Sequence, residues 1–153
     1  MFTNIIPSSD KLLQVKYGDY AAGHFLMDFE KKYPGLQWVV TNNSIMADLS
    51  RLRMPNNDTQ KSSQIDELRH NGDYWLAKFD FRVAKTKEST KTSGSRCIVF
   101  IDNSRDSLSI LLIYNKNHLP KNKDETAYIF DVLKEQYPDY EKKLRLVFAP
   151  IKR

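Results

Sequence analysis

The chain has 153 residues, of which 41% are hydrophobic and 12% aromatic, so it is long enough for one domain and too apolar to be intrinsically disordered. Its net charge of +5 and isoelectric point near 9.2 favour a polyanionic partner such as nucleic acid, a membrane surface or an acidic protein. Its single cysteine, Cys97, excludes an internal disulfide and a cysteine-based zinc site.

No segment predicts export or insertion into a membrane. Residues 1–10 lack the charged start and apolar run of a signal peptide, and no stretch of about 18 apolar residues occurs anywhere. We therefore expect a soluble, cytoplasmic protein without a membrane partner, folded as one domain over residues 1–153.

The N-terminal part is predicted to be mainly helical, with a helical region over residues 20–53. Before it, residues 12–17 (LLQVKY) form an apolar run that predicts a first strand. From Tyr20 to Tyr33, apolar residues recur every three or four positions, which predicts an amphipathic helix ending before Pro34. Two further helical pieces follow, the second with Ser44 as its N-cap.

The core of the sheet is predicted within residues 74–127. The preceding segment, residues 54–73, is polar and turn-rich, with a helical turn expected around Ile65 and Leu68. Residues 74–83 (YWLAKFDFRV) alternate between apolar and polar side chains, as a half-buried strand does. We expect Trp75, Phe79 and Phe81 to face the helices, with Phe25 and Phe29 packed against them.

A hairpin and a helix complete the predicted fold. Residues 96–102 (RCIVFID) and 108–114 (LSILLIY) are β-rich runs separated by turn residues. Asn122 and Glu125 form a plausible capping pair for a helix ending at Tyr137, and residues 144–149 add a strand or a packed tail. The expected class is α+β, with a small, mainly antiparallel sheet packed on two N-terminal helices, and a C-terminal helix.

Cations gather on and after the strand at residues 74–83. Lys78, Asp80 and Arg82 fall on the face opposite the aromatic residues, which we expect to be open to solvent. Lys85, Lys87 and Lys91 follow in a Ser/Thr-rich loop, and the next strand begins at Arg96. Such a face either is merely solvated, preventing edge pairing, or meets an anionic ligand.

RNA is one ligand that this face would suit. Cleavage of RNA without a metal needs a base, cations that stabilise charge on the phosphate, and a proton donor. Lysine and arginine supply the cations, and Tyr114 or His118 could transfer protons. We expect no cofactor, because the three histidines are too dispersed for a metal site. A DNA-reading helix-turn-helix near Pro34 is an alternative, disfavoured by the β-branched residues 39–41.

Residues 74–127 resemble the core of the RelE/HigB toxins. The resemblance rests on the strand "YWLAKFDFR", the linker ending "KTSGSR", the strand "CIVFI", and "ILLIYNKN" followed by a helix. It implies a RelE-like fold and a ribosome-dependent messenger-RNA endonuclease that a cognate antitoxin protein restrains. The longer N-terminal part, the extended linker and the helix after the last core strand depart from compact members of the family.

The resemblance also implies site residues by position. It assigns catalytic roles to Lys78, Arg82, Arg96 and Lys116. Less secure candidates are Tyr114 and His118 for catalysis and Asn117 for RNA binding. The charge of the loop adds Lys85, Lys87 and Lys91 as RNA-binding residues. Two alternatives remain open: a gyrase inhibitor of the related ParE branch, and a non-enzymatic RNA-binding module that uses the same face only for docking.

Overall fold

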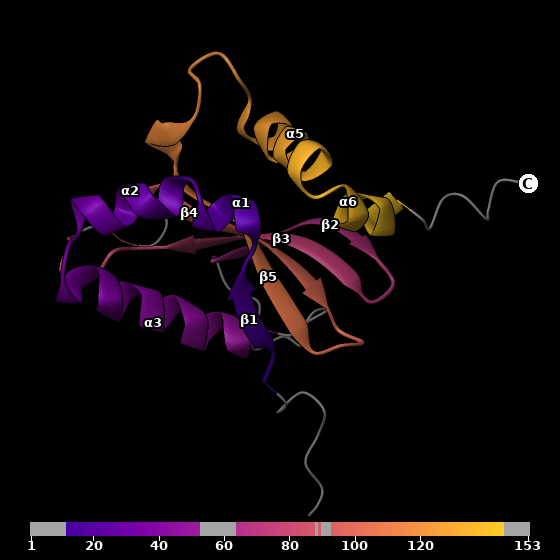
Figure 1. Ribbon diagram of the computed structural model, residues 1–153, viewed down its shortest axis with the longest axis horizontal. Helices are drawn as coiled ribbons and strands as arrows, with labels where there is room; N and C mark the ends of the chain where they lie inside the picture. The colour runs from indigo at the N-terminus through magenta and orange to yellow at the C-terminus, as the bar shows by residue number, and fades with distance from the viewer. Residues whose placement is uncertain (1–11, 53–63, 88, 90–92, 146–153) are drawn as a thin grey trace, which may run out of the picture.

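The computed structural model describes residues 12–52, 64–87, 89 and 93–145, and its centre is a five-stranded sheet of order β1-β5-β4-β3-β2 (Figure 1). The strands are β1 (Gln14–Tyr17), β2 (Ile65–Asn71), β3 (Tyr74–Phe81), β4 (Ser95–Asp102) and β5 (Ser107–Asn115). Strands β2 to β5 pair antiparallel, whereas β1 pairs with β5 in parallel. The predicted α+β class with a mainly antiparallel sheet is confirmed.

Two groups of helices flank this sheet. The helices α1 (Asp19–Ala22), α2 (Phe25–Lys32) and α3 (Leu36–Ser50) lie between β1 and β2 in the chain. The 3-10 turn η3 (Lys116–His118) and the helices α5 (Glu125–Gln136) and α6 (Pro138–Arg145) follow β5. Within the described ranges, no helix has the length and apolar character needed to cross a lipid bilayer.

The first face of the sheet packs on α2 and α3. Phe29 is only 4% exposed, and its ring centroid lies 5.2 Å from that of Trp38 and 5.6 Å from that of Phe81. Trp75, Ala77, Phe79, Phe81 and Val83 belong to the same core cluster, which confirms the alternation expected in residues 74–83. Phe25 differs from the prediction, because its ring stacks on His118 instead.

The second face of the sheet is covered by α5 and α6, which lie on the side opposite α3 (Figure 1). Leu76, Ile98 and Phe100 pack there with Ile129 and other buried residues of these helices. The expectation of an open face is therefore wrong. Strands β4 and β5 are apolar on both faces, a composition typical of strands between two layers of helices.

The N-terminal helices differ from the predicted boundaries. The helix expected from Tyr20 to Tyr33 is divided at Gly23 and His24 into α1 and α2. The two pieces expected around Ser44 are one helix, α3, whose polar residues bind neighbouring segments. The Thr41 hydroxyl donates to the Gln37 carbonyl oxygen at 2.8 Å and accepts from the Ala84 amide, also at 2.8 Å.

The segment around Ile65 and Leu68 is the edge strand β2, not a helical turn. Its residues pair with those of β3, and Asp66 lies opposite Lys78. This strand pairing outweighs the weak helical pattern of the local sequence. Asp124, rather than Asn122, caps α5 by accepting from the Ala127 amide at 3.1 Å. Residues 144 and 145 end α6, and the rest of the segment 144–149 lies outside the described residues.

Candidate functional site

Three predicted site residues meet beneath the first turn of α5. The sheet register places Arg96 opposite Asp80 on β3 and opposite Tyr114 on β5. Lys78 lies two positions before Asp80 on the same face, because side chains alternate along a strand. Glu125, the first residue of α5, reaches down to this group. We call Lys78, Asp80, Arg96, Tyr114 and Glu125 the Arg96 cluster.

The Arg96 guanidinium holds the cluster together. Its Nη1 donates to both carboxylate oxygens of Glu125 at 2.5 Å, and its Nε lies 3.3 Å from Oδ1 of Asp80. The Tyr114 hydroxyl donates to Oε2 of Glu125. Lys78 Nζ lies 3.9 Å from Oε1 of Glu125. Two cations and two carboxylates therefore compensate one another within the cluster.

Burial and these contacts shift the protonation equilibria. Burial acts to raise the pKa of Glu125, but hydrogen bonds from Arg96 and Tyr114 and the charge of Lys78 outweigh it and lower that pKa. For Asp80, burial outweighs Arg96 and Lys78, so its pKa is raised. Burial, together with the hydrogen bond to Glu125, also raises the pKa of the Tyr114 hydroxyl.

This arrangement occupies the cations that were expected to hold a phosphate. Side chains of Lys78 and Arg96 are 19% and 17% exposed, and both lie beside Glu125. An added phosphate would have to compete with a carboxylate that the helix N-terminus also favours. Tyr114 is fully buried and its raised pKa holds its proton, so it is not a base in this conformation.

Other predicted residues gather at one end of the sheet. Phe81 at the end of β3 pairs with Ser95 at the start of β4, and Ser95 pairs with Asn115 at the end of β5. Arg82 and Lys116, the residues that follow β3 and β5, therefore leave the sheet at the same end, and both are exposed. Lys85, Lys87 and Asn117 are exposed too, whereas Lys91 lies outside the described residues.

The strand ends themselves are held firmly at this position. The Asn115 side-chain amide donates to the Ser93 carbonyl oxygen and to the Ser95 hydroxyl, both at 3.0 Å. Gly94 has a φ of +75°, and the Lys116 side chain crosses it so closely that a Cβ there would lie 3.0 Å from Cγ of Lys116. The Gly94 backbone thus fixes where the Lys116 side chain leaves the sheet.

A cavity of about 350 Å³ opens between this end of the sheet and the Arg96 cluster. Its lining consists of three lysines with Asn117, two apolar residues and Glu125: Lys116, Asn117, Leu119, Pro120, Lys121, Lys123 and Glu125. Lys123 pairs with Asp131 on α5. Lys116 and Lys121 are exposed at the cavity, which gives it an excess of positive charge. We call Arg82, Lys116, Asn117 and Lys121 the basic end.

His118 is a part of the local structure of η3. The Asn115 amide donates to its Nδ1 at 2.9 Å, its ring stacks on Phe25 with centroids 4.4 Å apart, and its Nε2 lies 3.5 Å from Oδ2 of Asp28. Burial lowers the pKa of His118, although Asp28 acts in the opposite direction. The imidazole of His118 therefore lies against α2, and its Nδ1 already accepts the hydrogen bond from the Asn115 amide.

Sequence reasoning did not identify Asp80 as a partner of Arg96, nor Glu125 as a member of the site. The sequence places Asp80 on the polar face of its strand, and in the sheet Asp80 lies directly opposite Arg96 on the neighbouring strand. Glu125 gave a weaker signal, because its place in a capping pattern predicts a role at the helix terminus. Its approach to Arg96 depends on the path of residues 116–124, which local patterns do not determine.

Comparison with models of protein families, with curated proteins and with solved structures finds no match to this chain.

Proposed function

We propose that this protein binds single-stranded RNA at its basic end. The observation that carries the proposal is that Arg82 and Lys116 follow β3 and β5, the two strands that flank β4, and leave the sheet at the same end, where Lys116 and Lys121 line a cavity. Phosphate contacts from lysine and arginine supply most of the affinity in such complexes, and the net charge of +5 supports it.

The shape of this end favours a flexible strand over a DNA duplex. Duplex readers usually insert a helix into the major groove, and α3, the helix after Pro34, carries no lysine or arginine from Leu36 to Ser50. A cavity with an Asn side chain, apolar Leu119 and Pro120, and lysines suits a backbone phosphate with an unstacked base beside it. Docking without catalysis is consistent with the ion pairs inside the Arg96 cluster.

Salt-dependent binding to a short fluorescently labelled RNA tests this proposal. Arg82→Ala and Lys116→Ala should each weaken binding, and each should reduce the slope of log affinity against log salt by about 0.7. Arg105→Ala is the matched control, since Arg105 is 79% exposed in the turn between β4 and β5, at the other end of the sheet. Equal losses in all three variants would contradict a localised interface.

A second proposal is ribonuclease activity of the RelE/HigB type, with messenger RNA on the ribosome as substrate and an antitoxin protein as restraining partner. The observation in its favour is that Lys78, Arg96 and Tyr114, predicted from separate strands, lie in one cluster. Cleavage would require Glu125 to release Arg96. The RNA 2′-oxygen would then attack the adjacent phosphorus while its proton passes to water. The bond from phosphorus to the 5′-oxygen would break, the Tyr114 hydroxyl would donate a proton to the departing 5′-oxygen, and the product would be a 2′,3′-cyclic phosphate.

Three measurements test this second proposal. The protein should cut messenger RNA on ribosomes although no divalent metal is supplied to the protein itself. A 2′-deoxy substitution at the scissile nucleotide should block this cleavage. Glu125→Gln should raise the cleavage rate if Glu125 withholds Arg96. Cleavage of the deoxy substrate would contradict attack by the 2′-hydroxyl. Unchanged RNA binding together with absent cleavage would reject the nuclease and leave the docking function intact.

A further inference from the structure

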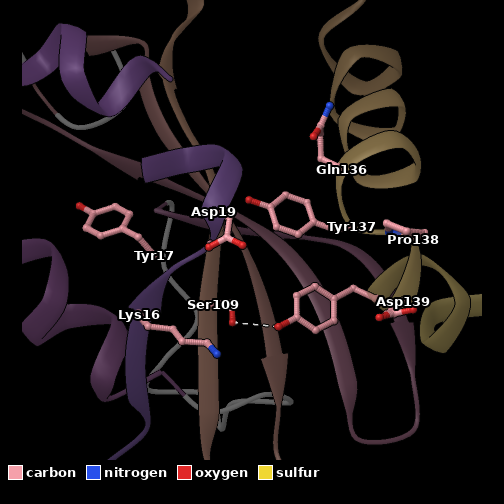
Figure 2. A pocket seen from close by; sticks show the side chains of 10 residues that line it. Lys16, Tyr17, Asp19, Ser109, Gln136, Tyr137, Pro138 and Asp139 are labelled. Carbon is pink, nitrogen blue, oxygen red and sulfur yellow. Dashed lines mark hydrogen bonds between the residues drawn. The ribbon is translucent and has the colours of Figure 1, made fainter. Parts of the chain in front are cut away.

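A second cavity of about 350 Å³ lies away from the basic end, where β1 and α1 face the junction of α5 and α6 (Figure 2). Its walls come from three segments that are distant in the sequence, at residues 16–19, Ser109 and 136–140. This volume is within the range of small-molecule sites in proteins. None of its lining residues belongs to the Arg96 cluster or the basic end.

The back wall of the cavity is rigid. The Tyr137 hydroxyl accepts from the amides of Tyr20 at 3.1 Å and Ala21 at 3.3 Å, and it donates to the Leu111 carbonyl oxygen at 2.8 Å. Gly18 lies directly against this ring, since a Cβ at Gly18 would be 2.6 Å from the hydroxyl oxygen. Such a wall needs little reorganisation when a ligand binds.

A small polar residue makes room for the cavity. Ser109 is a small polar residue within the apolar β5 and is only 4% exposed. Its hydroxyl lies 3.3 Å from the Tyr140 hydroxyl. Two such hydroxyls share one proton between their oxygens, and the second proton can be donated to a ligand. The floor of the cavity can therefore donate a hydrogen bond.

Two residues of opposite charge, Lys16 and Asp19, lie near the Ser109 and Tyr140 hydroxyls in the cavity wall. Figure 2 shows the Lys16 ammonium and the Asp19 carboxylate both directed toward the space in front of Ser109, while Tyr17 points away from it. Within the described part of the chain, neither charge forms an ion pair, and Asp139 on the rim adds a second carboxylate. Lys16 is the register partner of Ser109, so its ammonium lies beside the hydroxyl pair.

We propose that this cavity binds a small zwitterion of the amino-acid class. The ligand ammonium lies at Asp19, with Asp139 nearby, and the ligand carboxylate accepts from Lys16 and from the one hydroxyl of the Ser109–Tyr140 pair whose proton is free. The side chain of the ligand packs on Tyr137 and Pro138, which favours an aromatic or apolar amino acid. A ligand with only one of these charges would leave the opposite protein charge without its partner.

Three related probes separate these requirements: L-phenylalanine, phenethylamine without the carboxylate, and 3-phenylpropanoate without the ammonium. Titrations followed by amide NMR should show that L-phenylalanine shifts the signals of residues 16–19, 107–110 and 136–140. Each truncated probe should bind at least about tenfold more weakly. Equal binding of either truncated probe would overturn the zwitterion assignment.

Variants of the chain locate the site. Lys16→Gln and Asp19→Asn should each weaken L-phenylalanine binding at least about tenfold, because each removes one charge partner. Lys31→Gln and Asp48→Asn are matched controls on α2 and α3, and they should bind as the wild type does. The amide spectrum of each variant verifies that it is folded. Wild-type affinity weaker than about 10 mM, or unchanged affinity in both cavity variants, would overturn the proposal.

Discussion

The Arg96 guanidinium links two carboxylates, Asp80 and Glu125, whose pKa values the folded structure shifts in opposite directions. Arg96 contacts both Asp80 and Glu125. Burial prevails at Asp80, whereas at Glu125 the hydrogen bonds from Arg96 and Tyr114 and the nearby positive charges together outweigh burial. The pKa of Glu125 is lowered, so Glu125 stabilises the fold above its unfolded pKa and loses this contribution as pH falls through its folded pKa. The raised pKa of Asp80 gives the reverse dependence.

Glu125→Gln should test this difference directly. The variant should lose about 1–3 kcal/mol of unfolding free energy at neutral pH, because Arg96 and Tyr114 lose a charged acceptor. As pH falls below 4.5, the ordinary pKa of glutamate, the wild type should lose stability faster than the variant. Thermal unfolding across this range measures both curves. Asp80→Asn should change the pH dependence with the opposite sign, and parallel curves for all three proteins would contradict the assignment.

Phe29 offers a test of the core at the same scale. Its ring fills the space between Trp38 of α3 and Phe81 of β3 and is almost completely buried. Phe29→Ala should therefore cost about 3–5 kcal/mol of unfolding free energy, measured by denaturant unfolding. Met27→Ala is the control on the same helix, since Met27 is 48% exposed. Similar losses for the two variants would show that Phe29 is not a core residue.

Among the elements, the turn from β1 into α1 depends on contact with the end of α5. Gly18 lies between the two elements with an ordinary extended backbone, at φ −73° and ψ 162°. What requires glycine there is space, because Tyr137 is held against it by three hydrogen bonds. Tyr137 therefore joins the end of the N-terminal strand and the start of α1 to the C-terminal helices.

Gly18→Ala should weaken this junction. The added methyl group would overlap the Tyr137 hydroxyl, and overpacking of this kind costs about 1–3 kcal/mol. Gly23→Ala is the control at the next glycine, where the nearest atom to an added Cβ is 3.6 Å away and φ is −96°. It should be neutral or slightly stabilising. Chemical unfolding that ranks Gly23→Ala as the more damaging change would contradict this description.

The sequence predicted the elements best where side-chain periodicity was strong. The alternation in residues 74–83 identified β3 and its buried face, and the turn-separated apolar runs identified β4 and β5. It failed for β2, because the charged segment IDELRHN gains its strand structure from pairing with β3. It also divided α3, because Ser44 was interpreted as an N-cap. In the structure the helix continues through this position, and the preceding Thr41 and Asn42 bind Ala84 and Tyr17.

For the whole molecule, helices on both faces of the sheet determine which cations can meet a ligand. The polar face of β3 alone suggested an open surface, and only the two-sided apolar character of β4 and β5 indicated a second layer. Lys78 and Arg96 consequently face Glu125, while Arg82 and Lys116 extend beyond the ends of their strands. The strand pattern made Lys78 and Asp80 predictable as neighbours on one face, but the approach of Glu125 from α5 was not predictable.

The parallel pairing of β1 with β5 has a consequence for the time course of folding. Strands β2 to β5 form a meander of neighbours in sequence, apart from the long connection between β3 and β4, whereas Gln14 pairs with Ser107 across 93 positions (107 minus 14). Closing so long a loop is entropically costly, so β1 should join the sheet after the meander has formed. Native-state hydrogen exchange should then show the amides of β1 opening at lower free energy than those of β4, so that, among the described strands, the earliest in the chain is the last to be secured.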